Sequence, residues 1–143
     1  MNAENKMRGE PLVSMVDDDP SVRSSTRRLL RSSGMRTEVF ASAEEFLQSG
    51  HVAETGCLIL DMTMPGMNGL ELQRRLAETG RLMPIVFLSA RASEQEERLA
   101  LQAGASSFLR KPVSKEALLN AIRAALERPP QQLTEILKQK GSL

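Results

Sequence analysis

The chain has 143 residues and a nearly balanced charge, with 19 basic and 18 acidic side chains and a formal net charge of +1. A chain of this length fits one domain that buries a sizeable core without disulfide bonds. Because the charge is balanced, we expect no bulk attraction to nucleic acid or to a membrane surface. Four phenylalanines, without tryptophan or tyrosine, leave few rings on which bases can stack.

The compartment is indicated by cysteine usage and by the lack of long apolar runs. The single cysteine, Cys57, has no partner for an internal disulfide, which fits a reducing compartment. The first residues do not contain the apolar core of a signal peptide, and no window holds about 18 consecutive apolar residues. We therefore expect a cytoplasmic protein without membrane association. We expect residues 1–10 to form a flexible leader and residues 11–128 to form the folded domain.

The first predicted strand runs directly into a group of acids. Leu12–Val16 is short and mostly apolar, and Asp17, Asp18, Asp19 and Pro20 follow it. Asp19 before proline is typical of a helix N-cap. Asp17 and Asp18 have no such structural role, and they would repel each other unless a cation or solvent relieves them.

The next elements are a helix, a strand and a short helix. The helix is amphipathic and ends at Gly34, and we interpret its arginines as a solvated face. These arginines are Arg23, Arg27, Arg28 and Arg31. Arg36–Phe40 is a weaker strand candidate. Ser42 and Glu45 have the spacing of a capping box that starts a short helix.

The central stretch, Cys57–Leu72, predicts a buried strand that presents one acid. The apolar run Leu58–Leu60 ends on Asp61, and Pro65–Gly66 with Asn68–Gly69 indicates a loop before the next helix. Ligands of open parallel sheets bind at the carboxyl ends of strands, so Asp61 is placed for chemistry.

The rest of the chain repeats the alternation. A strand over Met83–Leu88 ends on Ser89, and a helix is predicted over Glu94–Ala103. A short strand over Ser107–Leu109 then meets Arg110-Lys111-Pro112, and a final helix begins near Ser114. Pro129-Pro130 breaks that helix, so residues 129–143 predict a linker or a truncated connection.

Five alternating strands and helices predict an α/β fold with a parallel sheet covered on both faces. Right-handed crossovers then bring the carboxyl ends of all strands to one edge. The polar residues at those ends are Asp17, Asp18, Asp61, Ser89 and Lys111.

This set of side chains suits phosphoryl transfer to a carboxylate. Three converging acids either raise their own pKa values or bind a hard cation such as Mg²⁺. Lys111 supplies a positive charge and Ser89 a hydroxyl donor, so the group can neutralise a phosphoryl group in transfer. Asp61, the only acid at the end of the central strand, is the natural acceptor.

The chain resembles the receiver domain of bacterial two-component response regulators. The resemblance covers about Leu12 to Leu126 and rests on VDDDP, LDMTMPGMNGLEL, FLSAR and FLRKP in that order. It implies a flavodoxin-like (βα)5 sandwich of three layers, with a five-stranded parallel sheet in the order 2-1-3-4-5.

The resemblance also implies a role for each acid. Asp61 would be phosphorylated, and Asp17 and Asp18 would hold Mg²⁺ with it, Mn²⁺ being the alternative cation. Thr63 would add its backbone carbonyl to the metal. The domain would be a signalling switch that catalyses only its own phosphorylation and dephosphorylation, and not otherwise an enzyme.

Further roles are implied around the phosphoryl group. Ser89 matches the family's switch residue, whose hydroxyl contacts the phosphoryl group, and Lys111 matches the family's site lysine. Phe108 matches the aromatic switch residue, and it would act by packing because it carries no hydroxyl. Thr63 and Arg91 occupy positions that tune access of water. The Lys111–Pro112 bond is expected to be cis.

The implied partners are a sensor histidine kinase and a second copy of the chain. The dimer would form on phosphorylation, through the fourth helix, the fifth strand and the fifth helix. The style of receiver resembles those of helix-turn-helix transcription regulators, so we expect an output domain that is absent from this chain, and no direct nucleic acid binding by these residues.

Three alternatives remain open. The chain could be a stand-alone receiver that acts by docking. An aspartate-nucleophile phosphatase would need a second acid at the position of Thr63. A flavin-binding electron carrier would need hydroxyls and amides in the first loop, where this chain has three acids.

Overall fold

The computed structural model describes residues 10–127. The strands are β1 (Leu12–Val16), β2 (Arg36–Phe40), β3 (Thr55–Leu60), β4 (Ile85–Ser89) and β5 (Ser107–Arg110). The helices are α2 (Pro20–Ser32), α3 (Ala43–Gln48), α4 (Gly69–Glu78), α5 (Glu94–Gln102) and α6 (Lys115–Leu126). The leader, apart from its last residue, and the linker expected over 129–143 lie outside the described residues.

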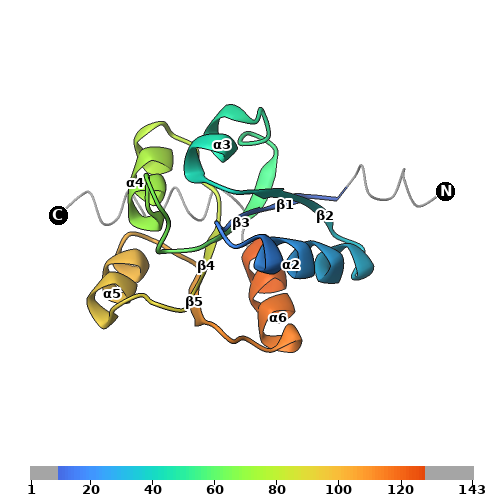
Figure 1. Cartoon of the computed structure of the whole chain (residues 1–143). Helices are drawn as coiled ribbons and strands as arrows, with labels where there is room; N and C mark the ends of the chain where they lie inside the picture. The colour runs from blue at the N-terminus through green and yellow to red at the C-terminus, as the bar shows by residue number, and fades with distance from the viewer. Residues whose placement is uncertain (1–9, 128–143) are drawn as a thin grey trace.

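The five strands form one parallel sheet in the order β2-β1-β3-β4-β5, which runs through the middle of the molecule (Figure 1). The predicted flavodoxin-like order is therefore confirmed. In the register, Val16 pairs with Leu60, and Leu60 pairs with Phe87. The ends of β1 and β3 are thus level, and β4 runs two residues further to Ser89, so the residues that follow β1 and β3 lie close to the end of β4.

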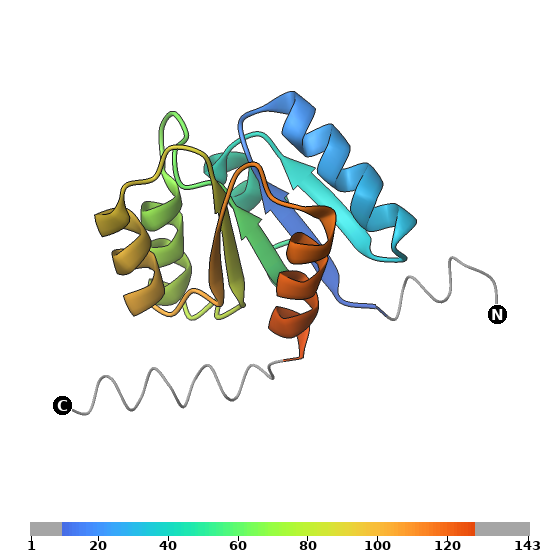
Figure 2. The same cartoon turned by 90° about the horizontal axis from the view of Figure 1, so that it is seen from below.

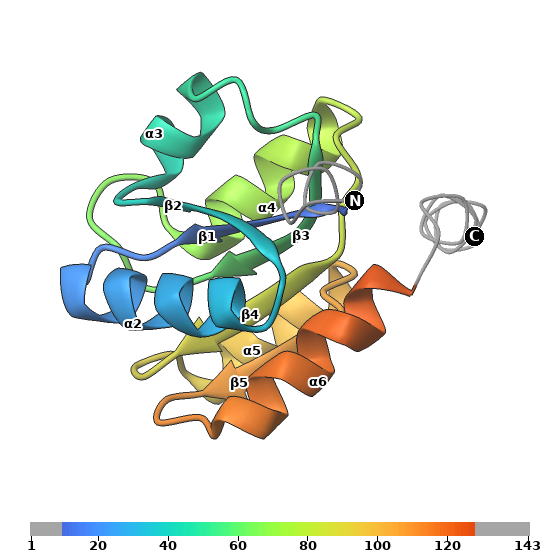
Figure 3. The ribbon, with the colours of Figure 1, turned by 90° about the vertical axis from the view of Figure 1, so that its right-hand side faces the viewer.

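The helices form two layers, one on each face of the sheet (Figure 2). Helices α3, α4 and α5 pack on Leu58 and Leu60, whereas α2 and α6 pack on Cys57 and Ile59. Figure 3 shows α2 and α6 on the same side of the sheet. All four strand residues are fully buried, because a strand alternates its side chains between two covered faces.

Two element starts differ from the prediction for local polar reasons. The central strand begins at Thr55, two residues before the predicted start at Cys57. The Thr55 hydroxyl can be buried there because it donates a hydrogen bond to the His51 carbonyl and lies 2.7 Å from the Ser14 hydroxyl. β4 begins at Ile85 and not at Met83. Pro84, which has no N–H for a ladder, contributes only its carbonyl, which accepts from the Leu58 N–H.

Helix starts follow the expected caps with one correction. Asp19 caps α2 by accepting from the backbone of Ser21. Ser42 caps α3 by accepting from the Glu45 N–H, but the Glu45 carboxylate accepts from the Ala41 N–H and not from that of Ser42. The predicted capping box is therefore only half formed. Within residues 10–127, none of the helices is both long and apolar enough to cross a membrane.

Gly69, the first residue of α4, generates a prediction about packing beneath Asp61. A Cβ at Gly69 would lie 2.7 Å from the Asp61 carbonyl oxygen and 2.9 Å from the Phe87 ring. We expect Gly69→Ala to lower the free energy of unfolding by about 2 kcal/mol, because backbone and ring must shift. Urea denaturation followed by circular dichroism would measure this loss in the free energy of unfolding. Ser24→Ala, on the exposed face of α2, is the control; equal stability of the two variants would contradict the prediction.

Candidate functional site

A cleft of about 560 Å³ lies at the carboxyl edge of the sheet. It collects residues from the ends of β1, β3 and β4 and from the residue after β5. The candidate residues in its wall are Asp17, Asp18, Asp61, Thr63, Ser89, Arg91 and Lys111. Side chains that the sequence separates by up to 94 residues are therefore brought together as the topology predicts.

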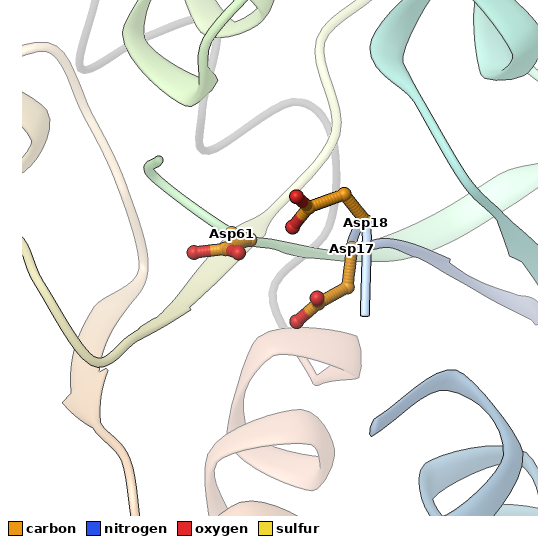
Figure 4. A group of neighbouring side chains, drawn as sticks. All are labelled: Asp17, Asp18 and Asp61. Atoms are coloured by element: carbon orange, nitrogen blue, oxygen red, sulfur yellow. The ribbon is translucent and has the colours of Figure 1, made fainter. Parts of the chain in front are cut away.

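Three carboxylates line this cleft, and Figure 4 shows them as neighbours. Asp17, Asp18 and Asp61 each offer an oxygen atom, and these atoms lie within 4.8 Å of one another. Asp17 is fully buried and Asp61 nearly so, whereas Asp18 is exposed. Hard carboxylate oxygens at this spacing, open to solvent on one side, fit a cation such as Mg²⁺ that keeps part of its water shell.

Lys111 is the cation that faces these acids. Its Nζ lies 2.7 Å from Asp17 Oδ2 and 3.8 Å from Asp61 Oδ2. The Lys111 N–H donates to the Ser89 carbonyl at 3.0 Å, which ties the end of β5 to the end of β4. The Lys111–Pro112 peptide bond is cis, as expected.

Asp61 is held where ionisation is costly. Burial raises the pKa of its carboxyl above the ordinary value, and the charge of Asp17 raises it further, while Lys111 opposes both. Its Oδ1 accepts from the Thr63 N–H at 3.3 Å. The site therefore favours the addition of positive charge near Asp61.

The loop after Asp61 is fixed at several points. Asn68 caps α4 in a full capping box, and the Gly69 N–H donates to the Met62 carbonyl. From α3, the Glu44 carboxylate accepts from the Met67 N–H at 3.0 Å. This bond also lowers the pKa of Glu44. The loop that carries Thr63 is thus anchored at its far end.

The remaining candidates occupy different surroundings. Ser89 is buried, and its Oγ makes no hydrogen bond of ordinary geometry with a described residue, although its hydroxyl is near enough to Asp61 to favour a lower pKa of that carboxyl. Arg91 is exposed on the rim of the cleft. Phe108 does not line the cleft: its ring is partly buried and stacks on Phe87, with 5.5 Å between centroids.

Three contributors to the site were missed from the sequence. Arg23, interpreted as part of a solvated face, is half-buried, and its Nη1 donates to the Asp17 carbonyl at 2.8 Å. Its position in the first turn of α2 was the available signal. Glu44 and Arg110 also bond to loops of the site, and nothing in their local sequence indicates those partners.

Comparison with known proteins identifies the family. Residues 13–123 match the response regulator receiver domain. The chain belongs to this family. Receiver domains are signalling domains that interact with histidine kinases, and the family match confirms the resemblance inferred from the motifs.

Individual relatives agree with the family match. The response regulator protein TmoT of Ectopseudomonas mendocina is 45% identical over 86% of this chain, and the transcriptional regulatory protein FixJ of Azorhizobium caulinodans is 37% identical over 84%. The chain covers 56% and 57% of those proteins, so it spans little more than half their length. The structure of the response regulator StyR is 40% identical, with a TM-score of 0.74 over 94% of this chain and 66% of that one.

The raised pKa of Asp61 predicts a pH-dependent gain in stability for Asp61→Asn. A group whose pKa is raised on folding contributes its full stability below the ordinary pKa and loses it as pH rises through the raised value. We therefore expect Asp61→Asn to unfold at higher urea than the wild type at neutral pH, with the gain vanishing near pH ~4.

Urea titrations without Mg²⁺ at several pH values would measure this difference. Asp19→Asn is the control, because asparagine preserves the N-cap of α2. A gain that is absent at neutral pH, or that grows on acidification, would show that burial does not penalise the Asp61 charge.

Proposed function

We propose that the domain is a phosphorylation-dependent switch that accepts a phosphoryl group on Asp61. The observation that carries this proposal is the cleft, where one lysine faces the acid cluster and a hydroxyl lies beside it. The phosphatase alternative is weaker, because an exposed threonine, Thr63, stands where its second acid would be needed.

The proposed transfer is an in-line displacement at phosphorus. An oxygen of Asp61 forms the new O–P bond, while the bond from phosphorus to the donor breaks. The electron pair of the breaking bond leaves with the donor, which is an imidazole nitrogen of a kinase histidine or the acetate oxygen of acetyl phosphate. Asp61 must be ionised to attack, so the neighbouring positive charge that favours its ionised form also favours the reaction.

A divalent cation would complete this charge balance. Asp17, Asp18, Asp61 and the Thr63 backbone carbonyl would hold Mg²⁺, with Mn²⁺ as the alternative. Bound there, the cation would supply positive charge to the phosphoryl oxygens. Lys111, whose Nζ already lies 3.8 Å from Asp61, would pair with another of those oxygens.

The switch would follow from the new charge. Ser89, buried without a hydrogen bond of ordinary geometry to a described residue, would donate its hydroxyl to the phosphoryl group, and Phe108 would repack against Phe87 in response. Thr63 and Arg91, on the wall of the cleft, would set how easily water reaches the phosphoryl group. Phosphorylation thus shifts a population between two arrangements.

The proposed partners are a sensor histidine kinase and a second copy of this chain. The dimer face is built from α5, β5 and α6, where Leu99 and Leu101 are the exposed large apolar side chains of the described residues. FixJ is transcriptional by name, and the chain covers only 57% of its length, so we propose that this receiver belongs to a transcriptional regulator with a separate output domain. A stand-alone receiver is the alternative. The buried Cys57 fits a cytoplasmic location.

Phosphorylation of Asp61 is directly testable. Incubation with acetyl phosphate and Mg²⁺ should add one phosphoryl group, detected by intact mass, and chelation of the cation should prevent it. Asp61→Asn should remove the adduct because the acceptor carboxylate is gone, whereas the matched Asp19→Asn should keep it. An adduct retained by Asp61→Asn would overturn the assignment.

The dimer face makes a second prediction. Beryllofluoride with Mg²⁺, which mimics the phosphoryl group, should raise the mass measured by light scattering from monomer towards dimer. Leu99→Ser on α5 should weaken dimerisation by about tenfold, because it removes an apolar side chain from the face. Leu70 packs against the core, so Leu70→Ser is not a suitable control. The control is Ser24→Ala on α2. A dimer unaffected by Leu99→Ser would place the interface elsewhere.

A further inference from the structure

Arg110 connects the end of β5 to the loop that follows β4. It pairs in register with Ser89 across the sheet and directly precedes Lys111. Its Nη1 donates to the Ala92 carbonyl at 2.6 Å, and its Nη2 lies 3.1 Å from Glu97 Oε1. One guanidinium therefore holds both the loop between β4 and α5 and the first half of α5.

The same guanidinium lies over the ring of Phe108. Its central carbon is 5.4 Å from the ring centroid, within the range of a cation–π contact. The other partner of that ring is Phe87 in β4. Arg110 thus contacts both Phe108, which is proposed to repack, and the loop that follows Ser89.

A short loop connects Ser89 to α5. Ser89 ends β4 and Ser93 is the N-cap of α5, so only three residues lie between them. Ala92, the acceptor of the Arg110 bond, is the last of the three and is buried. A shift of Ser89 towards Asp61 that also moved Ala92 would break the bond between Arg110 and the Ala92 carbonyl or carry Arg110 with it.

We propose that Arg110 is a positioning residue that holds this loop, and through it Ser89, in the arrangement that the structure shows, in which the Ser89 hydroxyl makes no hydrogen bond of ordinary geometry with a described residue. The inference rests on the proposed phosphorylation of Asp61. The hydrogen bond and ion pair of Arg110 form in one of the two switch states, so they stabilise that state against the other. Releasing them makes the phosphorylated arrangement easier to reach.

Arg110→Met tests this, because methionine keeps an apolar stem near Phe108 and removes both polar contacts. We expect beryllofluoride with Mg²⁺ to bind about fivefold more tightly than to the wild type, a size that allows for the exposure of this side chain. Calorimetry suits the measurement because the chain has no tryptophan or tyrosine. Amide hydrogen exchange over residues 90–93 should also be faster in the unliganded variant.

Two further variants divide the effect. Glu97→Gln weakens only the ion pair and leaves the Ala92 bond, so the affinity should change less than twofold. Arg110→Lys keeps a charge and one donor, and should fall between the wild type and Arg110→Met. If Arg110→Met does not fold, Arg110→Lys carries the same test with a smaller shift in the same direction.

The outcomes separate this inference from the function on which it rests. General loss of structure would weaken beryllofluoride binding, so tighter binding is a result that a purely structural role does not give. Unchanged or weaker binding, or unchanged exchange over residues 90–93, would overturn the role of Arg110. A wild type that binds no beryllofluoride would overturn the proposed function, while the exchange comparison would still decide whether Arg110 holds the loop.

Discussion

The ion pair between Lys111 and Asp17 is the contact on which the geometry of the cleft depends. At 2.7 Å it joins the residue after β5 to the residue after β1, although β3 and β4 lie between those strands. The Asp17 side chain is only 1% exposed. A buried carboxylate without a partner costs several kcal/mol, about 3–5 when one member of such a pair is removed. Asp17 Oδ1 also accepts from the Asp19 N–H at 2.9 Å, so Lys111 supplies the charge that balances Asp17 rather than its only hydrogen bond.

One ammonium group does not balance this cluster, and that shortfall explains the electrostatics. Lys111 lies 3.8 Å from Asp61, close enough to oppose but not to cancel the effects of burial and of Asp17 on the Asp61 pKa. A divalent cation that used Asp17 would compete with Lys111 for the same carboxylate. Lys111, which lies within 4 Å of both Asp17 and Asp61, can pair with either carboxylate.

The fold and most of the cleft follow from patterns that run along the chain. The alternation of strands and helices, with polar residues directly after β1, β3 and β4, indicated both the sheet and the edge at which Asp17, Asp61 and Ser89 meet. Lys111 was found by the same rule, because it follows β5. Such residues are positioned by the backbone, so their neighbours are fixed once the strand order is known.

The contacts that were missed depend on long side chains that reach across the fold. Arg23 turns back from α2 to the Asp17 carbonyl, and Glu44 reaches from α3 to the Met67 N–H. Their acceptor and donor are backbone groups, which every residue carries, so no residue type in the sequence marks them. Phe108 was assigned to the switch by resemblance alone, and its stack on Phe87 outside the cleft depends on side-chain packing that periodicity does not specify.

The distribution of packing around the sheet indicates which element can respond to a new charge. Helix α6 buries four side chains, whereas α5 buries only Ala100. Apart from the burial of Ala100, α5 is held by polar contacts. Gln73 Nε2 donates to the Ala100 carbonyl, and Glu97 pairs with Arg110. The Gln73 bond is buried, whereas the Glu97–Arg110 pair is partly exposed. A polar contact at a partly exposed surface is exchanged at lower cost than buried apolar area. Because α5 follows Ser89 after a short loop, it is the helix whose position can change while the core of the domain stays intact.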